Sequence, residues 1–250
     1  MRIPRIYTGP APLNPGSEIE LPDDAFRHTV QVLRLRPGAP LVLFNGDGND
    51  YPATLASVER RRAGVRIEGC KPNTSESPLE LHLVQAISKA EHMDLTLQKA
   101  VELGVHAIQP VLSIRGLRLP AERLARKLEH WRAVIVSACE QCGRSRIPEL
   151  RDPLKLDAWL QSQAPADGLR LLLDPCAAQG LDTLTPPTGT VELLIGPEGG
   201  FAPEELELAA RARLLGLRLG PRVLRTETAG IVATALLQAQ WGDLQHRATP

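Results

Sequence analysis

The chain has 250 residues, enough for one large α/β domain or two smaller ones. Its residues are 43% hydrophobic and 23% charged, which is typical of a globular protein and excludes a disordered chain. The 29 basic and 29 acidic residues give a formal net charge of zero, so the chain is not a uniformly basic nucleic-acid coat and any RNA contact must be local.

The sequence carries no signal for a membrane, a disulfide framework or a metal site. No apolar run approaches the roughly 20 residues that a membrane span needs, so we expect a cytoplasmic protein with no membrane association. Four cysteines are too few for a disulfide framework in a chain of this length. Cys139 and Cys142 form a C-x-x-C motif without a second ligand pair, so we expect free thiols and no metal.

The first 69 residues have the pattern of a small β-rich domain. Residues 41–44, 51–58 and 64–68 are β-like runs, and a turn signal, N-G-D-G, lies between the first two. Residues 24–33 are an expected helix, because their apolar side chains fall on one helical face. We therefore expect a small β-barrel with one helix.

The next stretch is an expected linker, because residues 70–78 have no apolar periodicity and contain two prolines. Assigning residues 71–78 to the linker separates a first domain, residues 1–70, from a second, residues 79–250.

Beyond the linker, strands alternate with helices. Such alternation predicts an α/β domain with a mainly parallel sheet covered by helices. The expected strands are residues 81–87, 107–112, 169–173 and 191–195, and the expected helices end near 103 or begin near 121, 203 and 226.

A glycine-rich turn, G-P-E-G-G at residues 196–200, follows the last of these strands and precedes a helix. In open α/β sheets, ligands bind beyond the carboxyl ends of strands, and glycine lets a ligand approach the backbone. The turn predicts a ligand loop, with a plain strand-to-helix turn as the alternative. It is neither a dinucleotide fingerprint nor a phosphate loop, because no G-x-G-x-x-G follows a strand and no G-K-S or G-K-T occurs.

A second notable segment, L-G-P-R-V-L-R-T-E-T-A at residues 219–229, leads into the last expected helix. Thr226 or Thr228 can cap that helix, whose amide end favours a polar or negatively charged ligand group. Arg225 is either a site residue or a surface partner of Glu227.

Together the two segments resemble the RsmE-type 16S ribosomal RNA uridine-N3 methyltransferases of the SPOUT superfamily. Two departures from that family's pattern are Cys142, where serine is more usual, and Asp174, where histidine is more usual before the proline. Further motifs in the family's order extend the resemblance over essentially the whole chain: R-I-P-R at 2–5, His28 with V-L-R at 32–34, Lys89 before Met93, Lys99 with E-L-G-V at 102–105, and E-Q-C-G-R at 140–144.

The resemblance implies a small N-terminal PUA-like RNA-binding domain, a C-terminal SPOUT domain with a trefoil knot, and a homodimer. It also implies S-adenosylmethionine as the cofactor, held by the loops after residue 173, after residue 195 and around 219–224. The implied cofactor-binding residues are Leu173, Ile195, Gly196, Pro197, Glu198, Gly199, Gly200, Leu219, Gly220, Val223, Leu224, Thr226 and Thr228.

The implied reaction is methylation of N3 of one uridine in 16S ribosomal RNA, within an assembled or nearly assembled 30S subunit. The alternatives are another SPOUT activity on a base or ribose 2′-hydroxyl of transfer RNA, an enzyme of another class with a Rossmann-like sheet, and a noncatalytic RNA-binding module. Because the uracil imide must lose a proton, a base or an electrostatic stabiliser is expected. Arg225 is the candidate stabiliser, and the base stays open between Glu198 and Glu227.

Basic residues at the matching positions are candidate RNA contacts. Lys89 and Lys99 are equally well interpreted as solvated charges, and His28 as a locally satisfied histidine. Arg144 and Arg146 are stronger candidates, because two neighbouring guanidinium groups can share adjacent phosphates. The full set is Arg5, His28, Arg34, Lys89, Lys99, Arg144 and Arg146.

Overall fold

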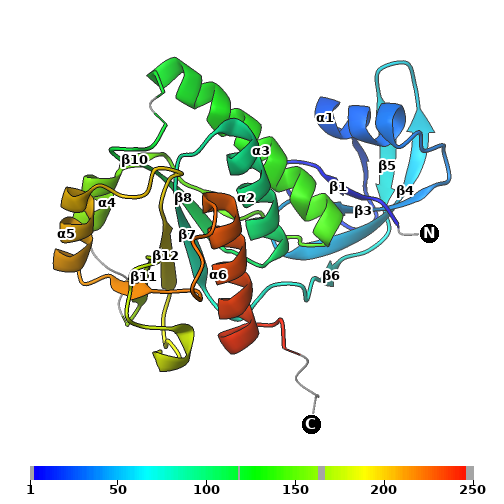
Figure 1. Cartoon of the computed structure of the whole chain (residues 1–250). Helices are drawn as coiled ribbons and strands as arrows, with labels where there is room; N and C mark the ends of the chain where they lie inside the picture. Colours follow the sequence, from blue (N-terminus) through cyan, green and yellow to red (C-terminus); the bar gives the residue numbers. More distant parts are fainter. Residues whose placement is uncertain (1–2, 118, 163–166, 246–250) are drawn as a thin grey trace, which may run out of the picture. The chain divides into compact units, whose positions relative to one another are not determined.

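The computed structural model describes residues 3–117, 119–162 and 167–245. The chain divides into two compact units, coloured along the sequence in Figure 1. Unit 1 comprises Met1–Glu76 and Val136–Ile147, and unit 2 comprises Ser77–Ile135 and Pro148–Pro250. In these described ranges, no helix is long and apolar enough to cross a membrane.

Unit 1 is built on a β-sheet. Its strands are β1 (Arg5–Tyr7), β2 (Glu18–Glu20), β3 (Pro40–Phe44), β4 (Asn49–Val58), β5 (Ala63–Ile67) and β6 (Lys71–Pro72). The order is β1-β3-β4-β5-β2, with β6 paired to β4, and only the β1–β3 pair in this sheet is parallel. Alternate residues of β4, namely Tyr51, Ala53 and Leu55, are buried in the core of the unit, as the period of a strand requires.

The helix predicted at residues 24–33 is present, but its form differs from a regular helix. It starts as α1 (Asp23–Phe26) and continues as a wider π-helical segment, Arg27–Val32. The Leu33 amide donates to the carbonyl of His28, five residues back, at 2.9 Å. Arg34 then adopts a φ of 54°, which ends the helix. His28 and Arg34 therefore do not share one regular helix.

Unit 2 has the predicted alternation of strands and helices. Every strand pair in its sheet is parallel, in the order β10-β8-β7-β12-β11-β13, with β9 paired to β8. The elements are β7 (Leu81–Ala86), α2 (Ala90–Glu102), β8 (Ala107–Leu112), α3 (Ala121–Cys142), β9 (Glu149–Leu150), β10 (Leu154–Lys155), α4 (Leu156–Gln161), β11 (Leu169–Leu173), a 3-10 turn (Leu181–Thr183), β12 (Val191–Ile195), α5 (Pro203–Arg211), β13 (Leu215–Leu217) and α6 (Thr226–Trp241).

Helices cover both faces of this sheet. On one face, α4 and α5 share a buried core with the strands that includes Trp159, Leu194 and Ala209. On the other face α2 packs against α6, and α6 also contacts β12. Gly230 of α6 comes so close to the sheet that an added Cβ would lie 3.5 Å from Gln85 Oε1. The helices cover the two faces of the sheet, so loops surround the carboxyl ends of the central strands.

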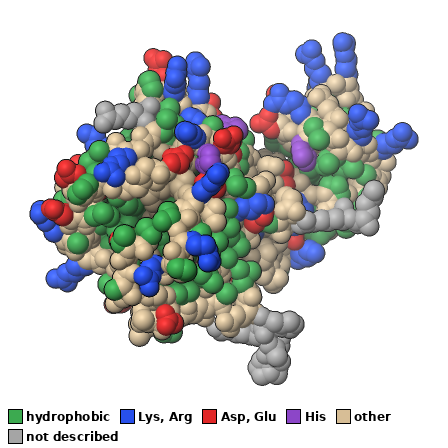
Figure 2. Space-filling model, viewed as in Figure 1, with side chains coloured by type: hydrophobic (Ala, Val, Ile, Leu, Met, Phe, Trp, Pro, Cys, Tyr) green, Lys and Arg blue, Asp and Glu red, His purple; other side chains and the backbone are tan. Residues whose placement is uncertain are grey.

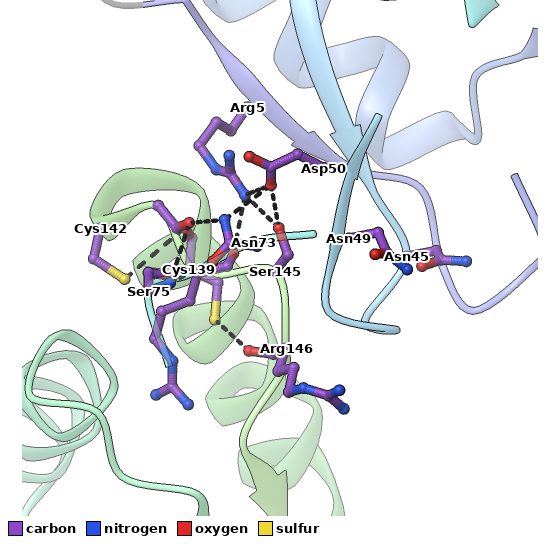
Figure 3. A network of polar contacts seen from close by, with 12 residues as sticks. Arg5, Asn45, Asn49, Asp50, Asn73, Ser75, Cys139, Cys142, Ser145 and Arg146 are labelled. Carbon is purple, nitrogen blue, oxygen red and sulfur yellow. Dashed lines mark hydrogen bonds and ion pairs between the residues drawn. The ribbon is translucent and has the colours of Figure 1, made fainter. Parts of the chain in front are cut away.

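Helix α3 contributes to both units, because its last turns and the residues up to Ile147 belong to unit 1. Figure 3 shows the polar network that joins this stretch to the strands of unit 1. Arg5 Nη2 donates to Asp50 Oδ1 at 3.0 Å and to Ser145 Oγ at 2.6 Å. Asn73 Nδ2 donates both to Asp50 Oδ1 and to the carbonyl of Gly143, each at 2.9 Å.

This network explains where the observed units differ from the sequence-based division. The sequence assigned residues 136–147 to the second domain, but their hydrogen bonds connect them to β1 and to the β4 residue Asp50. The first residues of the expected linker belong to the fold of unit 1, because Lys71–Pro72 forms β6, which pairs with β4, and Asn73 donates a hydrogen bond to Asp50. Periodicity along the chain cannot reveal such long-range pairing.

Candidate active site

A concave site in unit 2 lies beyond the carboxyl ends of three neighbouring strands, β7, β12 and β11. It is a cavity of about 620 Å³. Its walls are formed by residues 173–175, by most of the turn after β12, by Leu206, and by residues 219, 220, 222–227 and 229, together with Lys89 and His92. Figure 2 shows hydrophobic side chains gathered on the visible side of unit 2, in the region between α5 and α6. A cavity at this edge of a parallel sheet is where ligands bind in open α/β folds.

The start of α6 is tied to the turn after β12. The Thr226 hydroxyl donates to the carbonyl of Gly196 at 2.5 Å, and Gln85 Nε2 donates to that hydroxyl oxygen at 3.1 Å. The sequence suggested that Thr226 or Thr228 caps α6, but the helix begins at Thr226 and no side chain caps it. The Thr226 hydroxyl instead joins the two segments that the sequence singled out.

The glycine-rich turn favours glycine at one position through its backbone conformation and leaves little room for a side chain at another. Gly200 has a φ of 66°, in the left-handed region that side chains disfavour. An added Cβ at Gly196 would lie 3.1 Å from the Phe201 ring. The turn is also anchored at Glu198, whose Oε1 accepts the backbone amide of Lys89 at 3.1 Å. The same acidic residue that faces the cavity therefore holds the N-terminal end of α2.

The loop before α6 presents both apolar and basic groups to the cavity. Val223 is 81% exposed, unusual for a large hydrophobic residue, and Arg225 is also exposed. Gly220 has a φ of 70° and nothing within 4 Å of an added Cβ, so the backbone here is open. The loop can therefore contact a ligand with an apolar side chain, with backbone groups and with a guanidinium.

The cavity brings together 11 of the 13 cofactor-binding residues implied by the sequence. Gly199 and Thr228 are not among its lining residues. The Gly199 carbonyl instead accepts Arg115 Nη1 at 3.3 Å, outside the cavity. Arg225, the proposed catalytic residue, and both candidate bases, Glu198 and Glu227, do line it.

Sequence reasoning missed a histidine that lines the same cavity. His92 Nδ1 in α2 lies 2.8 Å from Glu227 Oε2 in the first turn of α6. Burial raises the pKa of Glu227, but the pairing with His92, a backbone hydrogen bond and the charges of His92 and Arg225 outweigh it, so the net pKa is lowered. Glu227 is therefore ionised at neutral pH. Only the packing of α2 on α6 brings these residues together, so no sequence motif could have indicated the pair.

Comparison with known proteins identifies the family. The RNA methyltransferase domain family matches residues 75–238, and the RNA methyltransferase PUA domain family matches residues 21–68. The ribosomal RNA small subunit methyltransferase E of Buchnera aphidicola is 32% identical over 98% of this chain and 96% of its own length. The enzyme of that name from Mycobacterium bovis is 33% identical, with 88% and 86% covered. The chain belongs to the ribosomal RNA small subunit methyltransferase E family.

Two solved structures resemble this methyltransferase E family member closely. One is a methyltransferase from Legionella pneumophila in complex with S-adenosylmethionine, with 43% identity and a TM-score of 0.94. The other is a ribosomal RNA small subunit methyltransferase E from Neisseria gonorrhoeae bound to S-adenosylmethionine, with 38% identity and a TM-score of 0.92. Each comparison covers 98% of this chain and 100% of the other. The mixed α/β fold with a PUA domain is thereby confirmed.

Two of the arginines predicted to bind RNA in this methyltransferase E chain instead have ion-paired side chains with little exposed surface, and that of Arg5 is 8% exposed. Arg5 is ion-paired with Asp50, and its guanidinium lies 5.2 Å from the centre of the Phe44 ring. Arg144 is 3% exposed and donates to both carboxylate oxygens of Glu76, at 3.2 and 2.7 Å. Each guanidinium faces a carboxylate in place of a phosphate, so these residues stabilise unit 1.

The other basic candidates are more accessible. Arg34 and Arg146 in unit 1 are exposed, and His28 is half-buried. Lys89 is exposed and lines the cavity of unit 2, whereas Lys99 is paired with Glu102 at 2.8 Å. Exposed cations without a short ion pair remain the stronger candidates for RNA contacts.

Proposed function

We propose that this chain transfers a methyl group from S-adenosylmethionine to N3 of a uridine in small-subunit ribosomal RNA. The observation that carries the proposal is the cavity formed by the family's two signature segments at the carboxyl ends of β11 and β12. Membership of the methyltransferase E family supports the ribosomal RNA substrate. The N3 position and the preference for an assembled 30S subunit rest on the sequence resemblance.

The residues around the cavity fit the cofactor. A volume of about 620 Å³ is in the range of cofactor sites, and the lining combines apolar side chains such as Leu173 and Ile195 with glycine backbone. The Gly196 and Gly220 segments would hold the cofactor through backbone groups. When bound, S-adenosylmethionine supplies a methyl carbon attached to a positively charged sulfur.

The chain's own residues then have two tasks. The first is alignment, because methyl transfer to nitrogen is an in-line displacement that depends on the placement of the two reactants. The hydrogen bond from the Thr226 hydroxyl to the Gly196 carbonyl connects the two loops that would set this alignment. The second is electrostatic, because uracil becomes anionic when N3 loses its proton. Arg225, exposed at the cavity wall, would stabilise that anion.

The decisive experiment uses labelled S-adenosylmethionine with 30S subunits, free 16S ribosomal RNA and transfer RNA in separate reactions. We expect label in N3-methyluridine, mainly from 30S subunits. Label in transfer RNA or on a ribose 2′-hydroxyl would contradict the proposed substrate and support the alternative SPOUT activity.

Calorimetric titration tests the cofactor independently of the substrate. We expect saturable binding of S-adenosylmethionine that a chelator does not affect. Binding of a nicotinamide cofactor in its place would overturn the assignment.

The same proposal includes two properties of the whole protein. We propose that it acts as a symmetric homodimer in the cytoplasm, as the family resemblance implies. Light scattering at low protein concentration tests the dimer, and a stable, active monomer would contradict it.

We also propose that the N-terminal domain contributes RNA affinity, through exposed cations such as Arg34.

A further inference from the structure

His92 and Glu227 place an imidazole and a carboxylate at ion-pair distance on the wall of the cavity. Both residues line the cavity, and 2.8 Å separates His92 Nδ1 from Glu227 Oε2. A carboxylate at Nδ1 favours the tautomer that carries its proton there and leaves Nε2 as the acceptor. Glu91 Oε1 lies 3.6 Å from Nε2, beyond hydrogen-bond distance. Nε2 is thereby available to a proton donor that enters the cavity.

The other polar groups of the cavity are less suited to accept a proton. Arg225 and Lys89 are cations. Glu198 is exposed and already accepts the Lys89 amide, and Asp174 Oδ1 accepts the Cys176 amide at 2.8 Å. Imidazole is the side chain whose ordinary proton affinity suits a base at neutral pH. Among the described residues that line the cavity, His92 is the only histidine.

We propose that His92, oriented by Glu227, is the general base that accepts the N3 proton of the target uracil. This inference rests on the proposed function and assigns the base that the sequence left open. The N3–H bond breaks as the proton moves to Nε2, giving an imidazolium that the Glu227 carboxylate stabilises. The N3 electron pair forms the bond to the methyl carbon, and the carbon–sulfur bond breaks with its electron pair returning to sulfur. The imidazolium then releases its proton to water.

The test compares two histidines that have the same kind of partner but different surroundings. His92→Ala removes the proposed base, whereas His130→Ala removes an exposed histidine whose Nε2 lies 2.8 Å from Asp94 Oδ2 and which does not line the cavity. We expect His92→Ala to lower turnover about 100-fold and His130→Ala to leave it unchanged. Calorimetry should give the same affinity for S-adenosylmethionine in both variants and in the parent chain.

Two further readouts separate a base from a structural residue. Added imidazole should restore part of the turnover of His92→Ala but none of that of Arg225→Ala. In the unliganded protein, nitrogen NMR of the His92 ring should show the proton on Nδ1, and Glu227→Gln should weaken that preference. The NMR result does not depend on activity, so it tests the pair even if the substrate has been assigned wrongly.

The outcomes distinguish this inference from the proposed function. If the parent chain methylates no N3 position in any ribosomal RNA preparation, the proposed function fails. If the parent chain is active and His92→Ala turns over normally, the base assignment is wrong while the function stands. Reduced turnover without imidazole rescue, accompanied by weaker cofactor binding, would reassign His92 to a structural role.

Discussion

The surroundings of a guanidinium decide whether an arginine acts in the fold or in the site. The side chain of Arg5 has little exposed surface, lies against Phe44 and is paired with Asp50, while Arg225 is exposed at the cavity wall. Both belong to motifs that the sequence singled out. Their substitution should therefore affect different measurements, folding stability for Arg5 and turnover for Arg225.

For Arg225 we expect a loss of turnover with cofactor binding retained. Arg225→Ala removes the proposed stabiliser of the uracil anion, and loss of one such group reduces turnover about 100-fold. The matched control is Arg211→Ala, whose side chain is 75% exposed in a surface pair with Glu207. Labelling of 30S subunits measures turnover, and calorimetry measures cofactor affinity. Normal turnover in Arg225→Ala would identify Arg225 as a surface residue at the start of α6.

For Arg5 we expect a loss of stability. Arg5→Met leaves the Asp50 carboxylate buried without its cationic partner, which costs about 3 kcal/mol of the free energy of unfolding. Arg62→Met is the control, because its 4.0 Å pair with Glu20 is exposed and contributes little. Urea unfolding followed by circular dichroism measures both. Equal stabilities of the two variants would contradict the structural role of Arg5.

The same carboxylate predicts a pH dependence. Burial raises the pKa of Asp50, but hydrogen bonds from Arg5, Ser145 and Asn73 and the charge of Arg5 outweigh it, so the net pKa is lowered. A carboxyl group with a lowered folded-state pKa stabilises the fold above its unfolded pKa, about 3.9, and this contribution is lost as pH falls through the folded value. Asp50→Asn should be less stable at neutral pH and lose less stability on acidification than the parent chain. An unchanged slope of stability against pH would contradict this.

At the scale of elements, the hydrogen bond of Thr226 that connects α6 to the turn after β12 should affect the affinity for the cofactor. Thr226→Val removes the hydroxyl that bonds the Gly196 carbonyl and Gln85, and loss of such a hydrogen bond corresponds to about a tenfold change in affinity. Thr228→Val is the matched control, because Thr228 does not line the cavity. Calorimetric titration compares the two. Weaker binding in Thr228→Val alone would favour the role that the sequence gave to that residue.

Elements with strong periodicity could be predicted from the sequence, and short paired elements could not. β12 was predicted at its observed bounds, because four of its five residues, V-E-L-L-I, are apolar and the run ends at a glycine. β1 and β2 have three residues each, and β1 pairs with β3, which follows it by more than 30 residues. Three residues carry too little pattern, and their strand state depends on the partner.

The candidate site shows the same division. Its two motif segments could be placed beyond strand ends, because the position of a loop after a buried strand is local information. His92 could not, since its relation to Glu227 depends on how α2 and α6 pack. The burial of these side chains could not be predicted from the sequence either. Arg144 and Arg146 are two residues apart, yet Arg144 is buried against Glu76 and Arg146 is exposed.

At the scale of the whole molecule, unit 1 should not fold from residues 1–76 alone. That fragment lacks residues 136–147, which supply Ser145 to Arg5 and the Gly143 carbonyl to Asn73. We expect a fragment of residues 1–76 to unfold without a cooperative transition, whereas the same fragment joined through a glycine-serine linker to residues 134–150 should unfold cooperatively. Circular dichroism during thermal unfolding compares them. A fully cooperative short fragment would show that the helix end is dispensable.

The sharing of α3 between the units also restricts how this protein can be divided or recombined. Following the chain from one end to the other, it passes between the units at residues 76–77, 135–136 and 147–148. A single protease cut in residues 71–78 would therefore leave the N-terminal piece bound by non-covalent contacts to the helix end that completes it. A gene rearrangement that moved only the first 76 codons would transfer an incomplete PUA domain. Exchange of this module between enzymes requires two separate stretches of chain to move together.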